Sequence, residues 1–402
     1  MIKRKVNIIL VVIFIIASLK LLFTIINYKN VDYYEVKEFS GIITDIKKYE
    51  DKTVFDLKNN KKYRITTYND FNFDLGDKVL INAEFYTPND NTTFNLFNYR
   101  KYLLSKNIEF EGKLNSIKLI DKNNNFLYKS KNFLIRYIEK YKSKHYLKSF
   151  VIGDNSSISI EVKNSYQDIG ISHLFAISGM HISLVLLIID NLFKKIKYKD
   201  LIIVIFFIVF LFITYYPISL IRCFSFYILS YINKRLKLGY KNYFIIVCIF
   251  FLMLLFNSYL IYNVGFLFSI IITFFVLLIS NEIKDYSKLK KSILISIISF
   301  FASIPIMALS FFKINIMWVI CNIIFIPIVT YIMFPLSLLT LIFPFLDKFY
   351  FIVIKSFEGF SLFIDNINLF EIIISKPSII ILLLYYCFLY LFIKVNKKFL
   401  II

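Results

Sequence analysis

The segment from Asp168 to Asp190 brings together residues whose types and spacing could support chemistry or line a path for a solute. It reads D-I-G-I-S-H-L-F-A-I-S-G-M-H-I-S-L-V-L-L-I-I-D, polar at its start and almost purely apolar afterwards. It holds two of the three histidines of the chain, His173 and His181, with Ser178 and Gly179 between them. Polar groups in an apolar segment long enough to enter a bilayer are costly, so they mark a candidate functional site.

One interpretation of this segment is nucleophilic catalysis, with Ser178 as the nucleophile and His181 as its base. The A-I-S-G sequence resembles the G-x-S-G of rhomboid-type intramembrane proteases, with Ala176 in place of the first glycine. The base of those enzymes comes from a distant helix, and no histidine follows His181 in this sequence. A membrane-embedded hydrolase acting on a lipid or a peptide therefore stays as the alternative function.

Metal binding and solute passage are two further interpretations. His173, His181, Asp168 and Asp154 are candidate ligands, but no spacing fixes their geometry and no C-x-x-C pair is present, so we expect no metal site. A helix interrupted between the two histidines would present backbone N–H groups and small side chains to a passing solute. The same small residues would allow close helix packing. We expect lining and packing together, with no catalysis and no cofactor.

The composition identifies the class of protein. Of the 402 residues, 58% are hydrophobic, the mean hydropathy is +0.66, and several continuous apolar runs reach membrane-spanning length. Continuous rather than alternating runs predict a polytopic α-helical membrane protein. The first run, Val6 to Ile26, follows a basic start and ends without a small-residue cleavage site, so we expect residues 1–26 to be a retained transmembrane helix.

Residues 27–125 show a different pattern, in which short strand-like runs alternate with turn signals. We expect strands at 41–46, 53–57, 62–67, 78–85 and 107–112, and one helix at 97–105. Five short strands with one helical interruption predict an OB-like barrel. Residues 126–150 repeat apolar side chains at helical spacing among lysines, which predicts an amphipathic interfacial helix. Residues 151–402 form the remaining, polytopic domain.

Charge gives the expected orientation. Clusters of lysine recur at alternate connections between the apolar segments, and by the positive-inside rule they face the cytoplasm. This places the N-terminus in the cytoplasm and residues 27–170 outside. Residues 27–149 carry 23 Lys and Arg against 16 Asp and Glu, a surplus that would help an OB-like domain hold a polyanionic strand. The net charge of +21 is also explained by orientation signals alone.

Arg222 is the next candidate, because it lies in the otherwise apolar run from Pro217 to Ile232. An arginine there needs a partner or a water-filled cavity. A phosphate contact is one role, since a guanidinium matches phosphate oxygens. An internal ion pair, or a side chain reaching up to the membrane surface, is the other.

Three stretches of the sequence resemble the ComEC family of bacterial competence proteins. H-L-F-A-I-S-G-M-H, preceded by Gly153-Asp154, is similar to the family signature. N-T-T-F-N-L-F-N-Y-R-K-Y-L is similar to a segment of the family's external domain, at Phe97, Tyr99, Arg100, Tyr102 and Leu103. The run around Gly265 resembles the family's G-F-Q-L-S-F, with Leu267 in place of the polar glutamine, which puts a polar contact there in doubt.

The resemblance implies a channel in the bacterial cytoplasmic membrane that imports single-stranded DNA during natural transformation. The channel and motif residues are then Asp154, His173, Ser178, Gly179, His181, Arg222 and Gly265. Tyr99, Arg100 and Lys101 are candidate DNA contacts of the N-terminal domain, although aromatics such as Phe94 and Phe97 could equally fill the barrel core. A family relic with no role in DNA transport is a third interpretation.

The resemblance also implies partners. They are single-stranded DNA, membrane lipids, a membrane DNA receptor and an ATP-driven translocase in the cytoplasm, with a second copy of the chain as a further candidate. Many family members continue into a β-lactamase-like metal hydrolase domain. This sequence contains no H-x-H-x-D-H-like cluster and ends at Ile402 after its last apolar run, so we expect any nuclease to be a separate protein.

Overall fold

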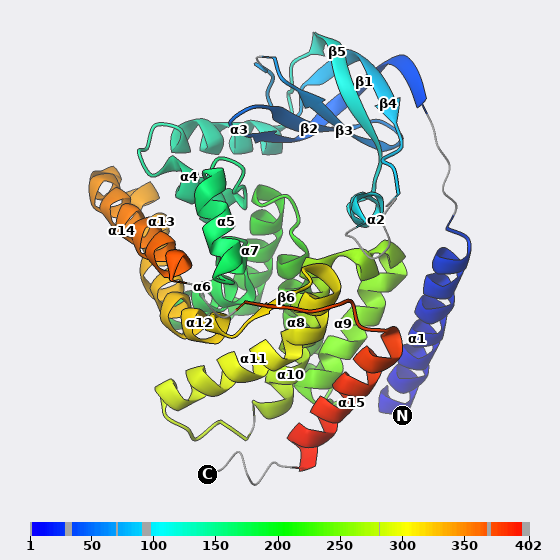
Figure 1. Cartoon of the computed structure of the whole chain (residues 1–402), viewed down its shortest axis with the longest axis vertical. Coiled ribbons are helices and arrows are strands. Elements are labelled where there is room, and N and C mark those ends of the chain that lie inside the picture. Colours follow the sequence, from blue (N-terminus) through cyan, green and yellow to red (C-terminus); the bar gives the residue numbers. More distant parts are fainter. Residues whose placement is uncertain are drawn as a thin grey trace.

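In the computed structural model, a β-barrel lies at one end of the molecule and a bundle of helices fills the rest, with the long first helix along one side (Figure 1). The structure describes residues 2–28, 34–69, 71–90, 98–280, 282–367 and 371–395. Phe94 and Phe97, named above as candidate barrel aromatics, lie outside the described residues.

The barrel confirms the expected OB-like domain. Its strands are β1 (Tyr34–Lys48), β2 (Thr53–Lys58), β3 (Lys62–Thr67), β4 (Lys78–Tyr86) and β5 (Ile108–Asp121). They close in the order β1-β2-β3-β5-β4, and β4 pairs back onto β1. Only β3 and β5 run parallel. Strands β1 and β5 are longer than predicted, because both ends of β4 find partners on them.

The barrel interior follows from period-two alternation. Along β4, Val79, Ile81, Ala83 and Phe85 point inward and are buried, while the residues between them are partly exposed. They pack with other apolar residues to form one core. Its buried members from the other strands are Ile43, Phe55, Leu57 and Ile65.

A buried ion cluster interrupts this apolar pattern on β2 and β3. Asp56 is 2% exposed and lies opposite Arg64 in the ladder, with its carboxylate 2.9 Å from Arg64 Nε and 3.0 Å from Lys62 Nζ. Burial alone would raise the pKa of the Asp56 carboxyl, but the charges of Arg64 and Lys62 outweigh burial and lower it. The carboxylate therefore stays ionised and holds both cations on one face of the barrel.

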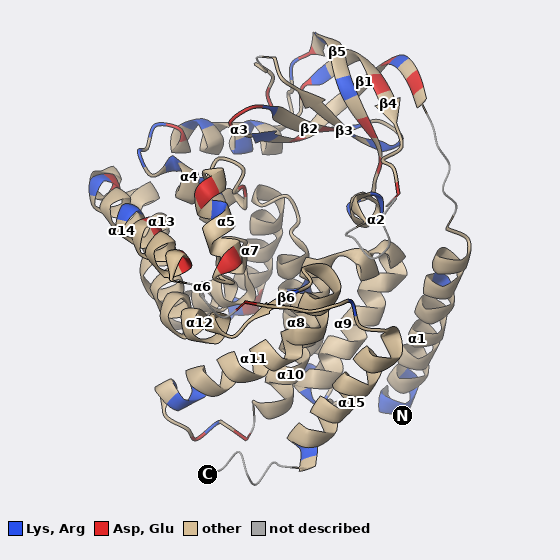
Figure 2. Ribbon diagram, viewed as in Figure 1, with Lys and Arg blue, Asp and Glu red and all other residues tan. Residues whose placement is uncertain are grey.

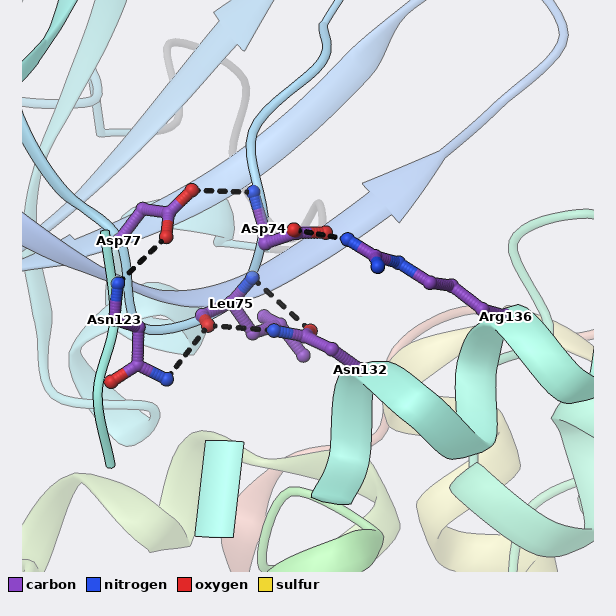
Figure 3. Close-up of polar contacts among 6 residues, drawn as sticks. All are labelled: Asp74, Leu75, Asp77, Asn123, Asn132 and Arg136. Carbon is purple, nitrogen blue, oxygen red and sulfur yellow. Dashed lines mark hydrogen bonds and ion pairs between the residues drawn. The ribbon is translucent and has the colours of Figure 1, made fainter. Parts of the chain in front are cut away.

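A second set of polar contacts joins the barrel to α3 (Phe126–Ile138). Figure 3 shows Asn132 of α3 bonded to both backbone groups of Leu75: its Nδ2 donates to the carbonyl at 2.9 Å, and its Oδ1 accepts from the N–H at 3.3 Å. Asp77 accepts from the backbone of Asp74 and of Asn123. Arg136 forms an ion pair with Asp74. Asn132, Arg136 and Asp74 thus fix the β3–β4 loop on the helix below it.

The segment 126–150, predicted as one amphipathic helix, contains three pieces. After α3 come α4 (Lys144–Leu147) and the π-helical turn η1 (Lys148–Ile152), which ends at Gly153 with φ of 81°. The polar connector that follows contains a helix that the sequence did not predict, α5 (Ile160–Asp168). Its buried Val162 and Tyr166 join the same apolar core as Phe150 of η1, so tertiary packing stabilises a short polar helix.

The remaining elements form the helical bundle. They are η2 (Ser172–Leu174), α6 (Gly179–Leu192), α7 (Lys199–Ile213), α8 (Ile218–Arg235), α9 (Asn242–Phe256), η3 (Ser258–Tyr262), α10 (Val264–Ile279), α11 (Lys288–Ser310), α12 (Met317–Ile328), η4 (Val329–Met333), α13 (Phe334–Ile342), η5 (Pro344–Leu346), α14 (Asp347–Asn366) and α15 (Ile379–Val395). Strands β6 (Lys313–Asn315) and β7 (Glu371–Ile373) pair with each other and were not predicted.

Four helical stretches among the described residues are long and apolar enough to cross a membrane. They are Lys3–Ile26, Ser172–Leu192, Lys288–Ser310 and Met317–Ile342, and three shorter apolar helices accompany them. Pro327 lies inside α12, and Pro335 lies in the first turn of α13, directly after the π-helical turn η4. A proline is tolerated in a first turn, and α12, η4 and α13 follow one another without a break.

The first helix, α1 (Ile2–Ile26), packs against α9, where Phe14 stacks on Phe251 with ring centroids 4.5 Å apart. Figure 2 shows Lys and Arg at the N-terminal end of α1, at the start of α11 and at the end of α15, all on the side away from the barrel. The bodies of the helices are almost free of charge in the same view. Charge is thus concentrated in the barrel, in α3 and at the ends of helices.

The buried ion cluster generates a first prediction. Replacing Asp56 by Asn leaves Arg64 and Lys62 without a counter-charge, so the barrel should lose about 3 kcal/mol of stability. Hydrogen exchange of the β2 and β3 amides in the full chain measures this loss. The matched control is Glu109→Gln, which breaks the exposed pair with Lys61 and should cost under about 1 kcal/mol. Equal effects of the two substitutions would contradict the assignment.

Candidate functional site

A cavity of about 2340 Å³ lies between the barrel and the helices and continues into the bundle. Its upper part is bounded by β1, β2, β3 and α3, and its lower part by α6, α8, α10, α11 and α12. In Figure 1 these helices lie below α3 and the barrel. The barrel and the bundle therefore share one internal space.

The residues that line this cavity are strongly biased toward positive charge. Nine are cations: Lys47, Lys58, Lys61, Lys62, Arg64, Lys106, Lys131, Arg222 and Lys313. Four are carboxylates: Asp45, Asp56, Glu109 and Asp154. From residue 167 onward the described lining has no Asp or Glu, and hydroxyl groups replace them. Among them are those of Ser178, Ser269, Thr273, Ser296, Ser299 and Ser303.

The central segment is interrupted where the sequence predicted. The short turn η2 carries His173, an extended stretch follows, and α6 begins at Gly179 with Ser178 as its N-cap at φ −110° and ψ 166°. The Ser178 backbone N–H donates to His181 Nδ1 at 3.2 Å, and Ser178 Oγ lies at the same distance from that nitrogen. His181 thus acts as the N3 residue of a capping box.

His181 is 0% exposed and lies between aromatic rings. Its ring stacks on Phe334 at 4.6 Å and meets Phe150 edge-on at 5.6 Å. Its Nε2 has no hydrogen-bond partner among the described residues. A catalytic base is normally oriented by a third group at this nitrogen, and none is present in the described part of the chain. The geometry of His181 is that of a packed cap at the start of α6.

His173 and Asp154 both line the cavity but lie on different elements. His173 Nδ1 is 3.1 Å from the Gly170 carbonyl, and Asp154 accepts the Ser156 N–H at 2.9 Å. No group of three His, Cys, Asp or Glu side chains among the described residues could hold a metal ion. Gly265 also lines the cavity, in the first turn of α10, which Asn263 caps by accepting the Phe266 N–H at 3.1 Å.

Arg222 lies on α8 inside the bundle and is 9% exposed. Its Nη1 donates to Thr273 Oγ1 of α10 at 2.5 Å, and its Nη2 lies 3.6 Å from Cys223 Sγ. No ion pair joins it to a carboxylate of the described residues. The internal ion pair that the sequence left open therefore has no support among the described residues. Arg222 lines the cavity.

The three barrel residues named as DNA contacts lie at the joint between the two parts of the molecule, on or beside α2 (Tyr99–Ser105), and not in the cavity lining. Tyr99 donates to Glu111 at 2.8 Å. Arg100 is 8% exposed, and Lys101 Nζ lies 4.6 Å from the Tyr28 ring centroid and 4.8 Å from that of Tyr262. Their role in DNA binding stays a prediction.

Sequence reasoning missed the basic residues that the barrel turns toward the cavity. Four of them are close in sequence, Lys58, Lys61, Lys62 and Arg64, around the β2–β3 turn. This run of cations was readable in the sequence, but it was taken only as a turn signal. What the sequence does not show is that the helices below close a cavity over this turn.

Lys131 of α3 is a further lining residue that the sequence did not single out. It is 4% exposed, donates to the Phe212 carbonyl at 3.1 Å, and its Nζ lies 3.0 Å from the centroid of the Tyr215 ring. Burial lowers the pKa of the Lys131 ammonium to about 7. The amine thus connects α3 to the end of α7 at the upper part of the cavity.

A closed five-stranded OB-like barrel above a bundle with several apolar helices of spanning length defines a multi-pass membrane protein with a cationic internal cavity. Residues 150–399 match the model of the Competence protein family, so the chain belongs to that family. This confirms the resemblance drawn from the H-L-F-A-I-S-G-M-H stretch.

One curated relative shows how far the similarity extends. The chain is 24% identical over 317 residues to ComE operon protein 3 of Bacillus subtilis (strain 168). The alignment covers 74% of this chain and 41% of the relative, so the chain spans less than half of that protein's length. No solved structure matches the chain.

The buried amine of Lys131 generates a second prediction. An exposed lysine has a pKa near 10.5, so between pH 7 and about 10 the unfolded chain binds more protons than the native one. Stability should therefore rise with pH above 7, and the full penalty of burying the charge applies below 7. Lys131→Met should raise the Tm by roughly 5 °C at pH 6 and flatten this pH dependence.

The measurement is thermal unfolding of the full chain in detergent between pH 6 and 9. Lys129→Met is the control, because Lys129 is exposed on the same helix and its loss should leave the pH dependence unchanged. A Tm that stays pH-dependent in Lys131→Met would assign the effect to another group.

Proposed function

We propose that this protein is a channel that carries single-stranded DNA across the bacterial cytoplasmic membrane during natural transformation. The observation that supports the proposal best is the charge of the cavity lining, nine cations against four carboxylates, with no Asp or Glu among the described lining residues from 167 onward. The cations stabilise a polyanion along such a path, whereas they do not stabilise a metal cation or a neutral lipid. Membership of the Competence protein family points the same way.

The order of the lining groups suits a moving strand. Phosphates meet the barrel cations first, and farther in they meet Arg222 and hydroxyl groups. Hydroxyls offer hydrogen bonds without holding a phosphate tightly, and conduction requires binding that is weak enough to release. No bond of the DNA is broken in this scheme, so the driving force comes from elsewhere. The partners in this proposal are a DNA receptor outside and an ATP-driven translocase in the cytoplasm.

The orientation follows from the distribution of charge. We place the barrel outside the cell and the N-terminus inside, because the basic ends of α1, α11 and α15 lie on the side away from the barrel. DNA would then reach the barrel face before it enters the bundle. Lipids contact the outward apolar side chains of α1 and α15, which are exposed along both helices.

The interruption at Ser178 distinguishes a channel from the alternative hydrolase, since Ser178 Oγ lies 3.2 Å from His181 Nδ1. In a channel the hydroxyl of Ser178 is dispensable, but the side chain at this position must stay small. Ser178→Ala should retain uptake of labelled DNA, and Ser178→Leu should abolish it by filling the cavity. In a hydrolase alanine removes the attacking atom, so activity would fall by orders of magnitude.

Uptake is measured in a strain that lacks the natural gene and is complemented by each variant, with the amount of protein in the membrane determined for each. Ser183→Ala is the matched control, because its hydroxyl lies on the same helix and bonds only to the Gly179 carbonyl. Loss of uptake in Ser178→Ala at a normal protein level would overturn the channel and favour the hydrolase.

The proposed orientation has its own test. In a cysteine-free variant, a cysteine at Asn60 of the β2–β3 turn should react with an impermeant maleimide added to intact cells. One at Lys195, between α6 and α7, should react only after the cells are opened. The reverse pattern of labelling would contradict the orientation and leave the family assignment untouched.

A further inference from the structure

We propose that Arg222 and the first turn of α6 form a binding site for one phosphodiester group inside the bundle. This inference rests on the proposed function, because DNA is the source of the phosphodiester. Phospholipid head groups have the same chemistry, and the experiment below separates the two sources. At this site the path would bind a phosphodiester more tightly than at the hydroxyl groups that line the rest of the bundle.

The first argument is the isolation of the charge on Arg222. The side chain is 9% exposed, and its described surroundings provide Thr273 and Cys223 but no carboxylate within ion-pair distance. Its Nε is buried and has no hydrogen-bond partner among the described residues. Burying a guanidinium costs free energy unless an anion or water compensates its charge. Arg222 is therefore suited to bind an anion that enters the cavity.

The second argument is the orientation of the guanidinium. Thr273 Oγ1 donates its own hydrogen to the Ser269 carbonyl at 2.6 Å, so toward Arg222 it can only accept. It therefore holds Nη1 in place at 2.5 Å. Nη2 is the other terminal nitrogen, and its contact with Cys223 Sγ is long, at 3.6 Å. In the proposed site Nη2 donates to an oxygen of the phosphodiester.

The third argument is the start of α6, which faces the same point. The backbone N–H groups of Gly179 and Met180 lie in the first turn of a 14-residue helix, where no preceding turn supplies an acceptor. Both residues line the cavity. The positive end of the helix dipole therefore adds to the charge of the arginine.

Because Gly179 has no side chain, the Arg222 guanidinium can lie close to the start of α6. A Cβ on Gly179 would lie 3.0 Å from Arg222 Nη2 and 3.4 Å from Cys223 Sγ. The guanidinium and the positive end of α6 are therefore neighbours, and an anion bound beside both would be stabilised by each. Any side chain at 179 would push the guanidinium away from the helix end and weaken the shared site.

The experiment uses the full chain in uncharged detergent and the reaction of Arg222 with phenylglyoxal, read by mass spectrometry. Trithymidylate should slow the modification of Arg222. Its methylphosphonate analogue, which has the same bases and no backbone charge, should not. The uncharged analogue protecting equally well would overturn the proposal, because protection would then be steric.

Variants test the contribution of each group to trithymidylate binding. Arg222→Gln should weaken it about tenfold or more, and Arg222→Lys should fail to restore it, since a lysine lacks the planar guanidinium that Thr273 holds in place. Thr273→Val keeps the charge of Arg222 but removes the hydroxyl that orients its guanidinium. We therefore expect a smaller, few-fold loss of trithymidylate binding. Arg235→Gln removes an exposed cation from the last turn of the same helix and should change nothing. Equal losses in Arg222→Gln and Arg235→Gln would overturn the site.

The lipid source is tested in nanodiscs without DNA. If phosphatidylglycerol protects Arg222 and phosphatidylcholine does not, the site belongs to a lipid head group and the proposal is overturned. DNA uptake is measured in parallel, so that the two proposals can fail separately. Normal uptake with no protection of Arg222 would remove this site and leave the channel in place.

Discussion

The outer faces of the helices meet hydrocarbon, and this constraint favours an inward position for the polar groups of the bundle. No water is available on that side, so Ser178, Thr273 and Arg222 line the cavity and His181 is buried. Many of the hydroxyls bond to a carbonyl of their own helix, as Thr273 does to Ser269 and Ser303 to Phe300. They make the interior polar without requiring partners across it, and an open space can persist between them.

The barrel borders the same cavity from the opposite side. Its core is closed and apolar, so its cations can only lie on outer faces, and the face formed by β2 and β3 is the one turned toward the bundle. Asp56 keeps Arg64 and Lys62 on that face, and α3 holds the barrel in position through Asn132 and Arg136 (Figure 3). The result is a cavity whose lining cations come from both the barrel and the helices.

The sequence was sufficient for the elements whose signal is local. Alternation along β4 predicts the barrel, and an apolar run interrupted by Ser178-Gly179 predicts the break before α6. It was not sufficient where tertiary contacts decide. The helix α5 is too short and polar to be stable alone, and the prolines at 327 and 335 stand inside the one helical stretch from Met317 to Ile342. The cavity lining could not be foreseen, because residues from β2 and α10 share it only in three dimensions.

Two asparagines between α9 and α10 hold the end of α2, and we call them the clamp. Their position in the sequence has a consequence for how the chain is made. The strands of the barrel are complete by residue 121, but the side chains that hold the end of α2 are Asn257, which donates to the Ser105 carbonyl at 3.0 Å, and Asn263, which donates to Ser105 Oγ at 3.1 Å. At roughly 5–20 residues per second, the ribosome adds the intervening residues in about ten seconds. Hairpins form in microseconds, so the barrel closes long before its clamp is synthesised. The nascent protein therefore carries a finished barrel whose contact with α2 is completed only after α9 has been synthesised.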